Sequence, residues 1–334
     1  MTAARALVAA AEPDSRPFYP AAALVAELLE ACAAGAAVGS AIDLGVVARV
    51  QAGPVAPDSV AADCGLTGQG AESLLAALVA LGLVTREDDG RFQPAFSRLT
   101  DFAELLRPWA SLPLALRGEW RAADAATTAG AEYLYPNVVG QLALLFRESA
   151  EHAAGLLTQA NPRVLDIGAG AAPWSLALAA RDPDREVTAV ELPAVMATTR
   201  AAVRAAGLER KYVFIEGDAF DVDWGKPASF DLALVGNLCH LFDEEANLRL
   251  LQRVAEAVRP GGTVAVIDIL ASERGDGPRA AALYALGLVL RTARGRIYPY
   301  SAFRRWLNES GFADLCRHRL AGPFSLSLIT ARRR

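Results

Sequence analysis

The first chemically suggestive stretch is an aspartate that comes just before a glycine-rich turn. The apolar run 164–167 contains Asp166 and leads directly into Gly168-Ala169-Gly170. Glycines at a strand-to-helix turn let a ligand approach the backbone and the helix N-terminus. A dinucleotide fingerprint would place a third glycine where this chain has Pro173. Because Asp166 would also repel a pyrophosphate, the turn favours an uncharged or cationic nucleoside derivative.

Two further acids occupy the matching position after later apolar runs. Glu191 ends the run 187–190, and Asp218 follows the run 212–215. An acid at the end of a second strand can accept hydrogen bonds from both ribose hydroxyls. A carboxylate at the end of the third can accept from an adenine amine. Together, the three acids predict a nucleoside site at one edge of a sheet.

The elements that must position these acids are short apolar strands alternating with helices. Continuous apolar strands between helices are typical of a parallel sheet covered on both faces. The last two apolar segments are joined by so short a link that only an antiparallel hairpin fits. We therefore expect an α/β fold with a Rossmann-like, seven-stranded, mostly parallel sheet and a C-terminal antiparallel hairpin. The expected strands are 164–167, 187–190, 212–215, 232–235, 264–267, 315–319 and 324–330.

The N-terminal third has the element order of a winged helix. Residues 21–48 indicate two alanine-rich helices interrupted near Gly35–Ser40, and a helix over 69–81 is followed by a hairpin over 83–93. A recognition helix that enters a DNA groove normally carries basic residues. Residues 69–80 contain Glu72 and no Arg or Lys. The sequence therefore favours a packing or dimerisation module over DNA binding.

The composition and charge of the chain limit the classes of protein to which it can belong. The 334 residues are 53% hydrophobic and 21% charged, with a net charge of −5. This balance excludes a disordered chain and argues against a nucleic-acid partner. No signal peptide is expected, and the apolar stretch 280–290 is shorter than the ~20 residues that span a bilayer. We expect a cytoplasmic protein with no membrane partner.

Four segments carry a resemblance to a known family: VLDIGAGAAPWSLALA, AVELP, EGDAF and LCHLFDEEANLRLLQRVAEAVRPGG. They resemble the class I S-adenosylmethionine-dependent methyltransferases. More narrowly, they resemble the small-molecule O-methyltransferases with a winged-helix dimerisation domain, of the plant caffeate and bacterial polyketide-tailoring types. The resemblance implies S-adenosylmethionine as cofactor, S-adenosylhomocysteine as product, and a homodimer formed through the N-terminal domain. No metal is expected, because the three acids are needed for the nucleoside and no further cluster of metal ligands remains in the sequence. The implied domains are a dimerisation domain over 1–100, a helical linker over 101–158 and a catalytic domain over 159–334.

The same resemblance assigns the cofactor residues. The two glycines of the turn would approach the methionine part, the acid of the second strand the ribose, and the acid of the third strand the adenine. The cofactor-binding residues expected are Asp166, Gly168, Gly170, Glu191, Leu192, Asp218, Ala219, Phe220 and Asn237.

His240 matches the family's general base. An imidazole can accept the proton of a phenol while the phenol oxygen attacks a sulfonium methyl group. Asp243 is expected to cap the helix that follows. Many members also carry a glutamate in a later loop that orients the histidine, but here residues 294–300 contain no carboxylate. Either another acid supports His240, or a general base is less important to the reaction of this protein.

The acceptor pocket is expected to have aromatic and aliphatic walls, which suit a planar hydrophobic small molecule. C- or N-methylation remains open, as do a repurposed pericyclic, decarboxylating or hydroxylating reaction and a ligand-responsive winged-helix regulator. The pocket candidates are Trp109, Trp120, Phe146, Tyr284, Leu288, Arg291 and Tyr298.

Overall fold

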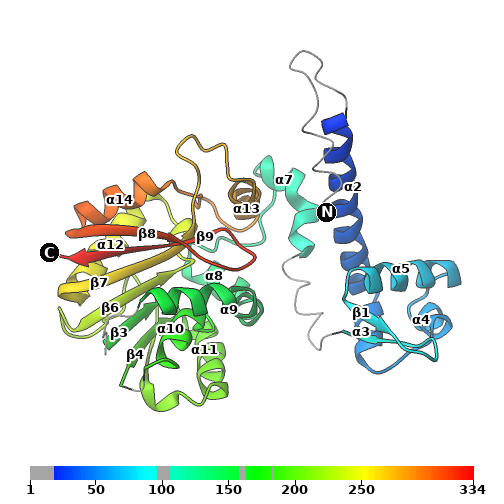
Figure 1. Cartoon of the computed structure of the whole chain (residues 1–334), viewed down its shortest axis with the longest axis horizontal. Helices are drawn as coiled ribbons and strands as arrows, with labels where there is room; N and C mark the ends of the chain where they lie inside the picture. The colour runs from blue at the N-terminus through cyan, green and yellow to red at the C-terminus, as the bar shows by residue number, and fades with distance from the viewer. Residues whose placement is uncertain (1–18, 96–105, 158–162, 183) are drawn as a thin grey trace. The chain divides into compact units, whose positions relative to one another are not determined.

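A computed structural model of the chain describes residues 19–95, 106–157, 163–182 and 184–334 (Figure 1). The chain divides into two compact units, Met1–Leu106 and Arg107–Arg334. The helices expected to form a linker therefore belong to the second unit. The boundaries expected at 100/101 and 158/159 both lie outside the described residues.

The first unit is mainly helical and ends in a small hairpin. Its core is formed by the buried sides of the short helices and of the hairpin, with Leu75, Leu78 and Phe92 among its members. Strands β1 and β2 pair antiparallel, which confirms the helix–helix–hairpin order. The elements are α2 (Tyr19–Asp43), α3 (Val46–Gln51), α4 (Pro57–Asp63), α5 (Gly68–Ala80), β1 (Val84–Arg86) and β2 (Phe92–Pro94).

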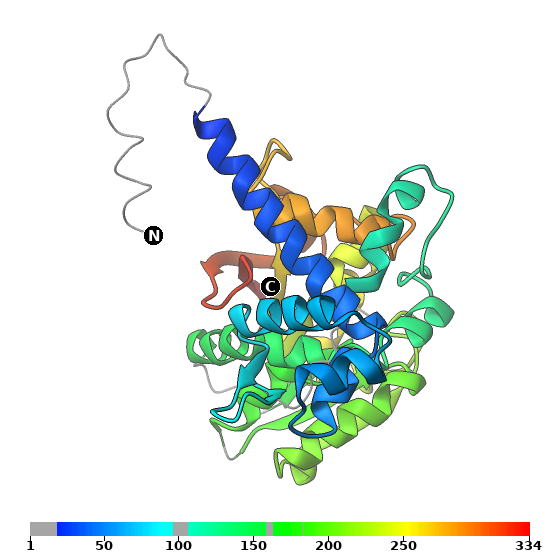
Figure 2. The same cartoon turned by 90° about the vertical axis from the view of Figure 1, so that its right-hand side faces the viewer.

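The expected break near Gly35–Ser40 is wrong, because α2 runs unbroken from Tyr19 to Asp43 (Figure 2). The helix ends at Asp43, and α3 begins after Gly45, whose φ of 77° is a left-handed conformation that glycine adopts without a steric penalty. Glycines inside a helix cost only about 1 kcal/mol each, and the surrounding alanines tolerate that.

Helix α2 also presents an apolar face that no other described residue covers. Leu24, Val25, Leu28 and Leu29 are 49–65% exposed. Residues Ala23–Asp43 are long and apolar enough to cross a membrane by length and composition, with 6% of the segment buried. This helix, rather than the stretch 280–290, is therefore the longest apolar segment among the described residues.

The second unit is built on the expected seven-stranded sheet, in the order β5-β4-β3-β6-β7-β9-β8. Its first five strands are parallel, and β9 and β8 close it as an antiparallel hairpin. The strand order reverses between β3 and β6, which is where α/β sheets bind ligands. The strands are β3 (Arg163–Ile167), β4 (Glu186–Glu191), β5 (Tyr212–Glu216), β6 (Phe230–Gly236), β7 (Val258–Ile269), β8 (Phe312–Arg319) and β9 (Leu326–Arg333).

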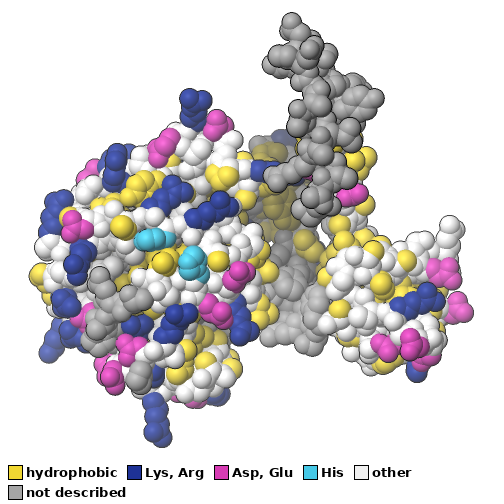
Figure 3. All heavy atoms as spheres, in the orientation of Figure 1, with side chains coloured by type: hydrophobic (Ala, Val, Ile, Leu, Met, Phe, Trp, Pro, Cys, Tyr) yellow, Lys and Arg dark blue, Asp and Glu magenta, His cyan; other side chains and the backbone are white. Residues whose placement is uncertain are grey.

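Helices cover both faces of this sheet. Successive strand residues alternate between two apolar clusters: Leu165 packs with α12 and α14, and Val164 packs with α9 and α10. On the face drawn in Figure 3, basic and acidic side chains are interspersed over this unit. The helices are η3 (Arg107–Ser111), α7 (Leu112–Leu116), α8 (Thr128–Leu134), α9 (Val139–Leu156), α10 (Pro173–Ala179), α11 (Pro193–Ala205), η4 (Glu209–Lys211), η5 (Cys239–Leu241), α12 (Glu244–Ala257), α13 (Arg279–Val289) and α14 (Tyr300–Glu309).

Candidate active site

The glycine turn after β3 has the conformation that its sequence requires. Gly168 and Gly170 have φ values of 65° and 57°, in the left-handed region. The backbone N–H of Gly170 donates to Oε2 of Glu191 at 2.6 Å. A Cβ on Gly168 would lie 3.2 Å from Leu238. The turn is therefore held against the ends of β4 and β6.

Glu191 lies at the end of β4, where the sequence placed it. Its Oε1 accepts from the backbone N–H of Leu192 at 2.7 Å, and the residue is 8% exposed. Burial raises the pKa of this carboxyl, although the hydrogen bonds from Gly170 and Leu192 oppose the shift. Because backbone donors hold this buried carboxylate in one position, it can accept hydrogen bonds from ligand hydroxyls in a defined geometry.

Asp166 lies inside the protein, beneath the glycine turn. Its carboxylate is 1% exposed and accepts from the Ser175 hydroxyl, which in turn accepts from Tyr212. Burial raises the pKa of Asp166 to about 7, and the hydrogen bond from Ser175 opposes this shift. These contacts tie β3 to α10 and β5, so Asp166 braces the turn from within.

Asp218 is held between two donors. Its Oδ1 accepts from the backbone N–H of Phe220 at 2.9 Å, and its Oδ2 accepts from the hydroxyl of Thr128 at 2.6 Å. Thr128 begins α8, so this bond fastens α8 across the end of β5. Beside it, the Phe220 ring packs edge-on against Phe242 at 5.1 Å, and Ala219 packs at the margin of the core.

A pocket of about 300 Å³ opens beside Phe242. Charged groups of both signs line it, including Asp243 and Arg249. Asp243 also caps α12 as expected, because its Oδ1 accepts from Ala246 N–H at 3.0 Å.

Asn237 supplies the sharpest test of whether a polar ligand fits at this edge. It follows β6 with a φ of 53°, which is rare for a residue other than glycine. Among the described residues its buried Oδ1 has no hydrogen-bond partner. A buried amide oxygen without a partner is costly, and a ligand donor would satisfy it. The residues present therefore fit the polar nucleoside cofactor that the sequence predicts.

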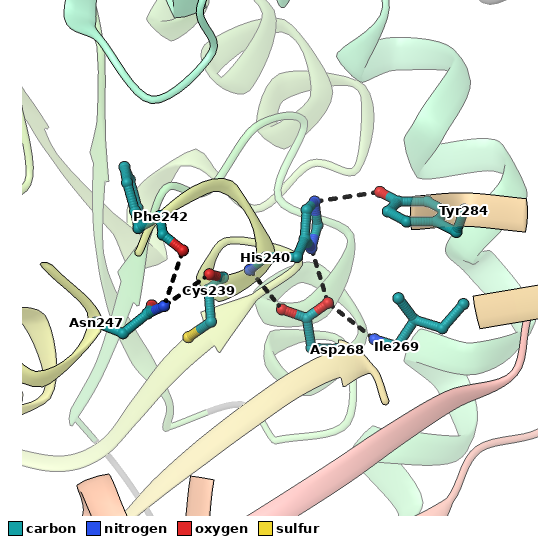
Figure 4. Close-up of polar contacts among 7 residues, drawn as sticks. All are labelled: Cys239, His240, Phe242, Asn247, Asp268, Ile269 and Tyr284. Carbon is teal, nitrogen blue, oxygen red and sulfur yellow. Dashed lines mark hydrogen bonds and ion pairs between the residues drawn. The ribbon is translucent and has the colours of Figure 1, made fainter. Parts of the chain in front are cut away.

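His240 lies in η5, directly after the same strand end, and it is buried with Asp268 (Figure 4). Its Nδ1 lies 2.7 Å from Asp268 Oδ1, and its backbone N–H donates to Oδ2 at 3.1 Å. The N–H of Ile269 donates to Oδ1 at 2.8 Å. A carboxylate that only accepts fixes the proton on Nδ1 and leaves Nε2 as an acceptor.

Asp268 is a candidate functional residue that was not expected from the sequence. It is an acid within the otherwise apolar end of β7, and it is 1% exposed. That isolated charge was the available signal. The loop that lacks a carboxylate does reach His240: a Cβ on Gly295 would lie 2.5 Å from the His240 carbonyl oxygen. The supporting acid comes from the sheet instead.

Tyr284 closes the other side of His240 (Figure 4). Its hydroxyl lies 3.2 Å from His240 Nε2, and the two rings are edge-to-face with centroids 5.2 Å apart. Burial raises the pKa of Tyr284, and the positive charge of Arg291 opposes that shift. Leu288 and Tyr135 pack in the same small apolar cluster. We call this cluster, with Arg291, the Tyr284 cluster.

The other pocket candidates lie elsewhere. Phe146 stacks with Trp174 at 5.8 Å in the core, and Tyr298 packs on Trp306 at 4.7 Å with its hydroxyl donating to the Phe242 carbonyl. These placements favour packing roles. Trp109 is 41% exposed and lies against Gly287 of α13. Trp120 is half-buried.

Sequence comparison places both units in one group of enzymes. The O-methyltransferase domain model matches residues 144–313, and the O-methyltransferase dimerisation domain model matches residues 26–107.

Two curated relatives show how far the likeness extends. The tetracenomycin polyketide synthesis 8-O-methyl transferase of Streptomyces glaucescens is 27% identical over 86% of this chain and 91% of its own. The 3-hydroxy-5-methyl-1-naphthoate 3-O-methyltransferase of Streptomyces sahachiroi is 29% identical over 48% of this chain, which spans about half of that relative (46%). Among solved structures, human N-acetylserotonin methyltransferase in complex with SAM shares the fold, with a TM-score of 0.73, 22% identity and coverage of 96% and 99% of the two chains.

The buried Asp166 carboxyl predicts a pH-dependent stability. Its pKa rises from 3.8 to about 7 on folding, so the folded state binds more protons than the unfolded state between these values. The free energy of unfolding should therefore fall as the pH rises through this window, by at most about 1.4 kcal/mol for each pH unit crossed. Asp166→Asn should flatten the dependence. Urea unfolding from pH 5 to 8 measures it; equal slopes for both proteins would contradict the assignment.

Proposed function

Since the chain belongs to the S-adenosylmethionine-dependent O-methyltransferase family of secondary-metabolite tailoring enzymes, we propose that it methylates a hydroxyl of a small aromatic acceptor with His240 as general base. The observation that carries this proposal is the buried His240–Asp268 pair, with Nδ1 and Oδ1 2.7 Å apart. A polyketide-derived or naphthoate-like acceptor is favoured because the two curated relatives are named for such compounds.

The cofactor residues proposed are those at the carboxyl ends of β3 to β6. Gly168 and Gly170 would face the methionine part, Glu191 with Leu192 the ribose, and Asp218 with Ala219 and Phe220 the adenine. Asn237 offers its unpartnered oxygen, and Asp166 supports the turn through Ser175. When bound, S-adenosylmethionine supplies an electrophilic methyl group.

Among the described residues, no cluster of three or more His, Cys, Asp or Glu side chains could hold a metal ion, and we propose catalysis without one.

The base works through its two ring nitrogens. Asp268 accepts from Nδ1–H, so the lone pair on Nε2 points toward Tyr284 and is available to an acceptor that takes the place of the Tyr284 hydroxyl. As an acceptor hydroxyl loses its proton to Nε2, the ring becomes a cation, and the adjacent carboxylate stabilises that charge. Burial of the pair strengthens this interaction, because little water screens it. Asp268 supplies a carboxylate where the loop has none, which supports His240 as the base and favours methyl transfer over a repurposed reaction.

We also propose a homodimer formed through the N-terminal unit. The dimerisation domain match covers residues 26–107, which include most of α2 and its exposed apolar face. An apolar face of this length is stabilised when a second copy covers it. This explains α2 without a membrane, and we propose a cytoplasmic enzyme that acts on small molecules and has no nucleic-acid partner.

The base assignment predicts a specific kinetic pattern. His240→Gln should lower kcat by about 10²–10⁴-fold, because general-base catalysis contributes that much, and should leave S-adenosylmethionine affinity unchanged. Asp268→Asn should also lower kcat, since an amide no longer enforces the Nδ1–H tautomer. Transfer of labelled methyl to a panel of hydroxynaphthalenes measures the rate, and calorimetry measures binding. The control is His152→Gln, on the surface helix α9. Wild-type kcat in His240→Gln would refute the role of base.

The dimer proposal predicts that charge on α2 separates the subunits. Leu28→Glu with Leu29→Glu should convert the dimer to a monomer in light scattering, because burying two carboxylates in an apolar interface is costly. Val213→Glu is the matched control: it lies on edge strand β5 and is comparably exposed at 61%. A dimer that survives the α2 pair would place the interface elsewhere.

A further inference from the structure

Arg291 lies beside Tyr284 in the Tyr284 cluster, and among the described residues it has no acidic partner. It follows α13, is half-buried, and its carbonyl accepts from the N–H of Ala125 at 2.7 Å, which fixes its backbone. In the parts of the chain that the structure describes, no carboxylate forms an ion pair with it. Its neighbour Arg294 differs, because it pairs with Asp243 at 3.0 Å.

The guanidinium of Arg291 faces the catalytic residues. Its Cζ lies 4.9 Å from the centre of the Tyr284 ring. The hydroxyl of that same ring lies 3.2 Å from His240 Nε2. A single aromatic ring therefore separates the unpaired cation from the general base. Burial raises the pKa of Tyr135, and the positive charge of Arg291 opposes that rise, as it does at Tyr284.

The side chains packed near this cation are mainly apolar. Leu288 and Ala125 are buried there, and Tyr135, Tyr284 and Ile297 pack against them. Cation–π contact with Tyr284 offsets part of the cost of withdrawing a guanidinium from water. A ligand carboxylate would satisfy the planar donor fork of the guanidinium, commonly by two parallel hydrogen bonds. A single arginine balances one negative charge, which favours a carboxylate over a phosphate dianion.

We propose that the methyl acceptor is a hydroxyaryl carboxylate, whose carboxylate binds Arg291 while its hydroxyl takes the place of the Tyr284 hydroxyl at His240 Nε2. This inference rests on the proposed function. In the reaction, the acceptor oxygen bonds to the methyl carbon as the methyl–sulfur bond breaks. The hydroxyl proton passes to His240, and the carboxylate stays ionised on Arg291. Tyr284 then acts as a positioning residue that occupies the base until the acceptor arrives.

The test compares matched acids and esters on the full-length protein saturated with S-adenosylhomocysteine. The probes are hydroxybenzoate and hydroxynaphthoate isomers, each paired with its methyl ester, and calorimetry gives their Kd values. At least one acid should bind about tenfold or more tightly than its ester, because the ester lacks the charge-assisted hydrogen bonds. Arg291→Gln should remove that preference by weakening the acid alone, and Arg291→Lys should retain part of it. Arg296→Gln, an exposed arginine of the same loop, is the control and should change neither.

Three outcomes would overturn the inference: equal or tighter binding of the esters, no binding of any acid, or equal weakening of acid and ester in Arg291→Gln. The proposed function is judged separately. If S-adenosylhomocysteine itself fails to bind, the proposed function falls. If it binds and neutral hydroxyaryl compounds are methylated in preference to the acids, only the carboxylate inference falls.

Discussion

The buried hydrogen bond between His240 and Asp268 is the interaction on which the rest of the site depends. One carboxylate accepts from the imidazole, from the His240 backbone and from Ile269, so it fixes the position and the tautomer of the proposed base together. The 3₁₀ turn that carries His240 is held from behind as well, because the Asn247 amide donates to the Cys239 and Phe242 carbonyls (Figure 4). Catalytic geometry of this kind needs rigid support, and the sheet provides it directly.

The acids at the strand ends support the glycine turn from two sides, one at the edge of the sheet and one in the buried interior. Glu191 holds the glycine turn through the Gly170 N–H while it stays at the edge of the sheet. Asp166 acts from within through Ser175, and the negative charge of Glu191 contributes to its raised pKa. Helix α8 is fastened over this edge at two points: Thr128 bonds Asp218, and Glu132 accepts from the N–H of Ala194.

Residues with a strong local pattern were predictable from the sequence, and residues defined by tertiary contacts were not. The five parallel strands, the closing hairpin and the position of His240 after β6 follow from apolar runs and short links. Asp268 was not predicted because its proposed role depends on a residue 28 positions earlier, and an isolated charge in an apolar strand does not by itself show which residue it supports. For the same reason, the sequence could not distinguish Tyr284 from Tyr298 as pocket residues. In the structure Tyr284 lies against His240, whereas Tyr298 packs on Trp306. The break in α2 was misplaced because glycine was given too much weight inside an alanine-rich helix.

The tautomer of His240 tests the central claim most directly. The chain has three histidines, so ¹⁵N-histidine NMR spectra can be assigned with His152→Gln and His318→Gln. At neutral pH, in the complex with S-adenosylhomocysteine, we expect a protonated Nδ1 with a strongly downfield, slowly exchanging proton, an unprotonated Nε2, and loss of that proton signal in Asp268→Asn. A His240 ring that is protonated on Nε2, or that exchanges freely between tautomers, would contradict the account.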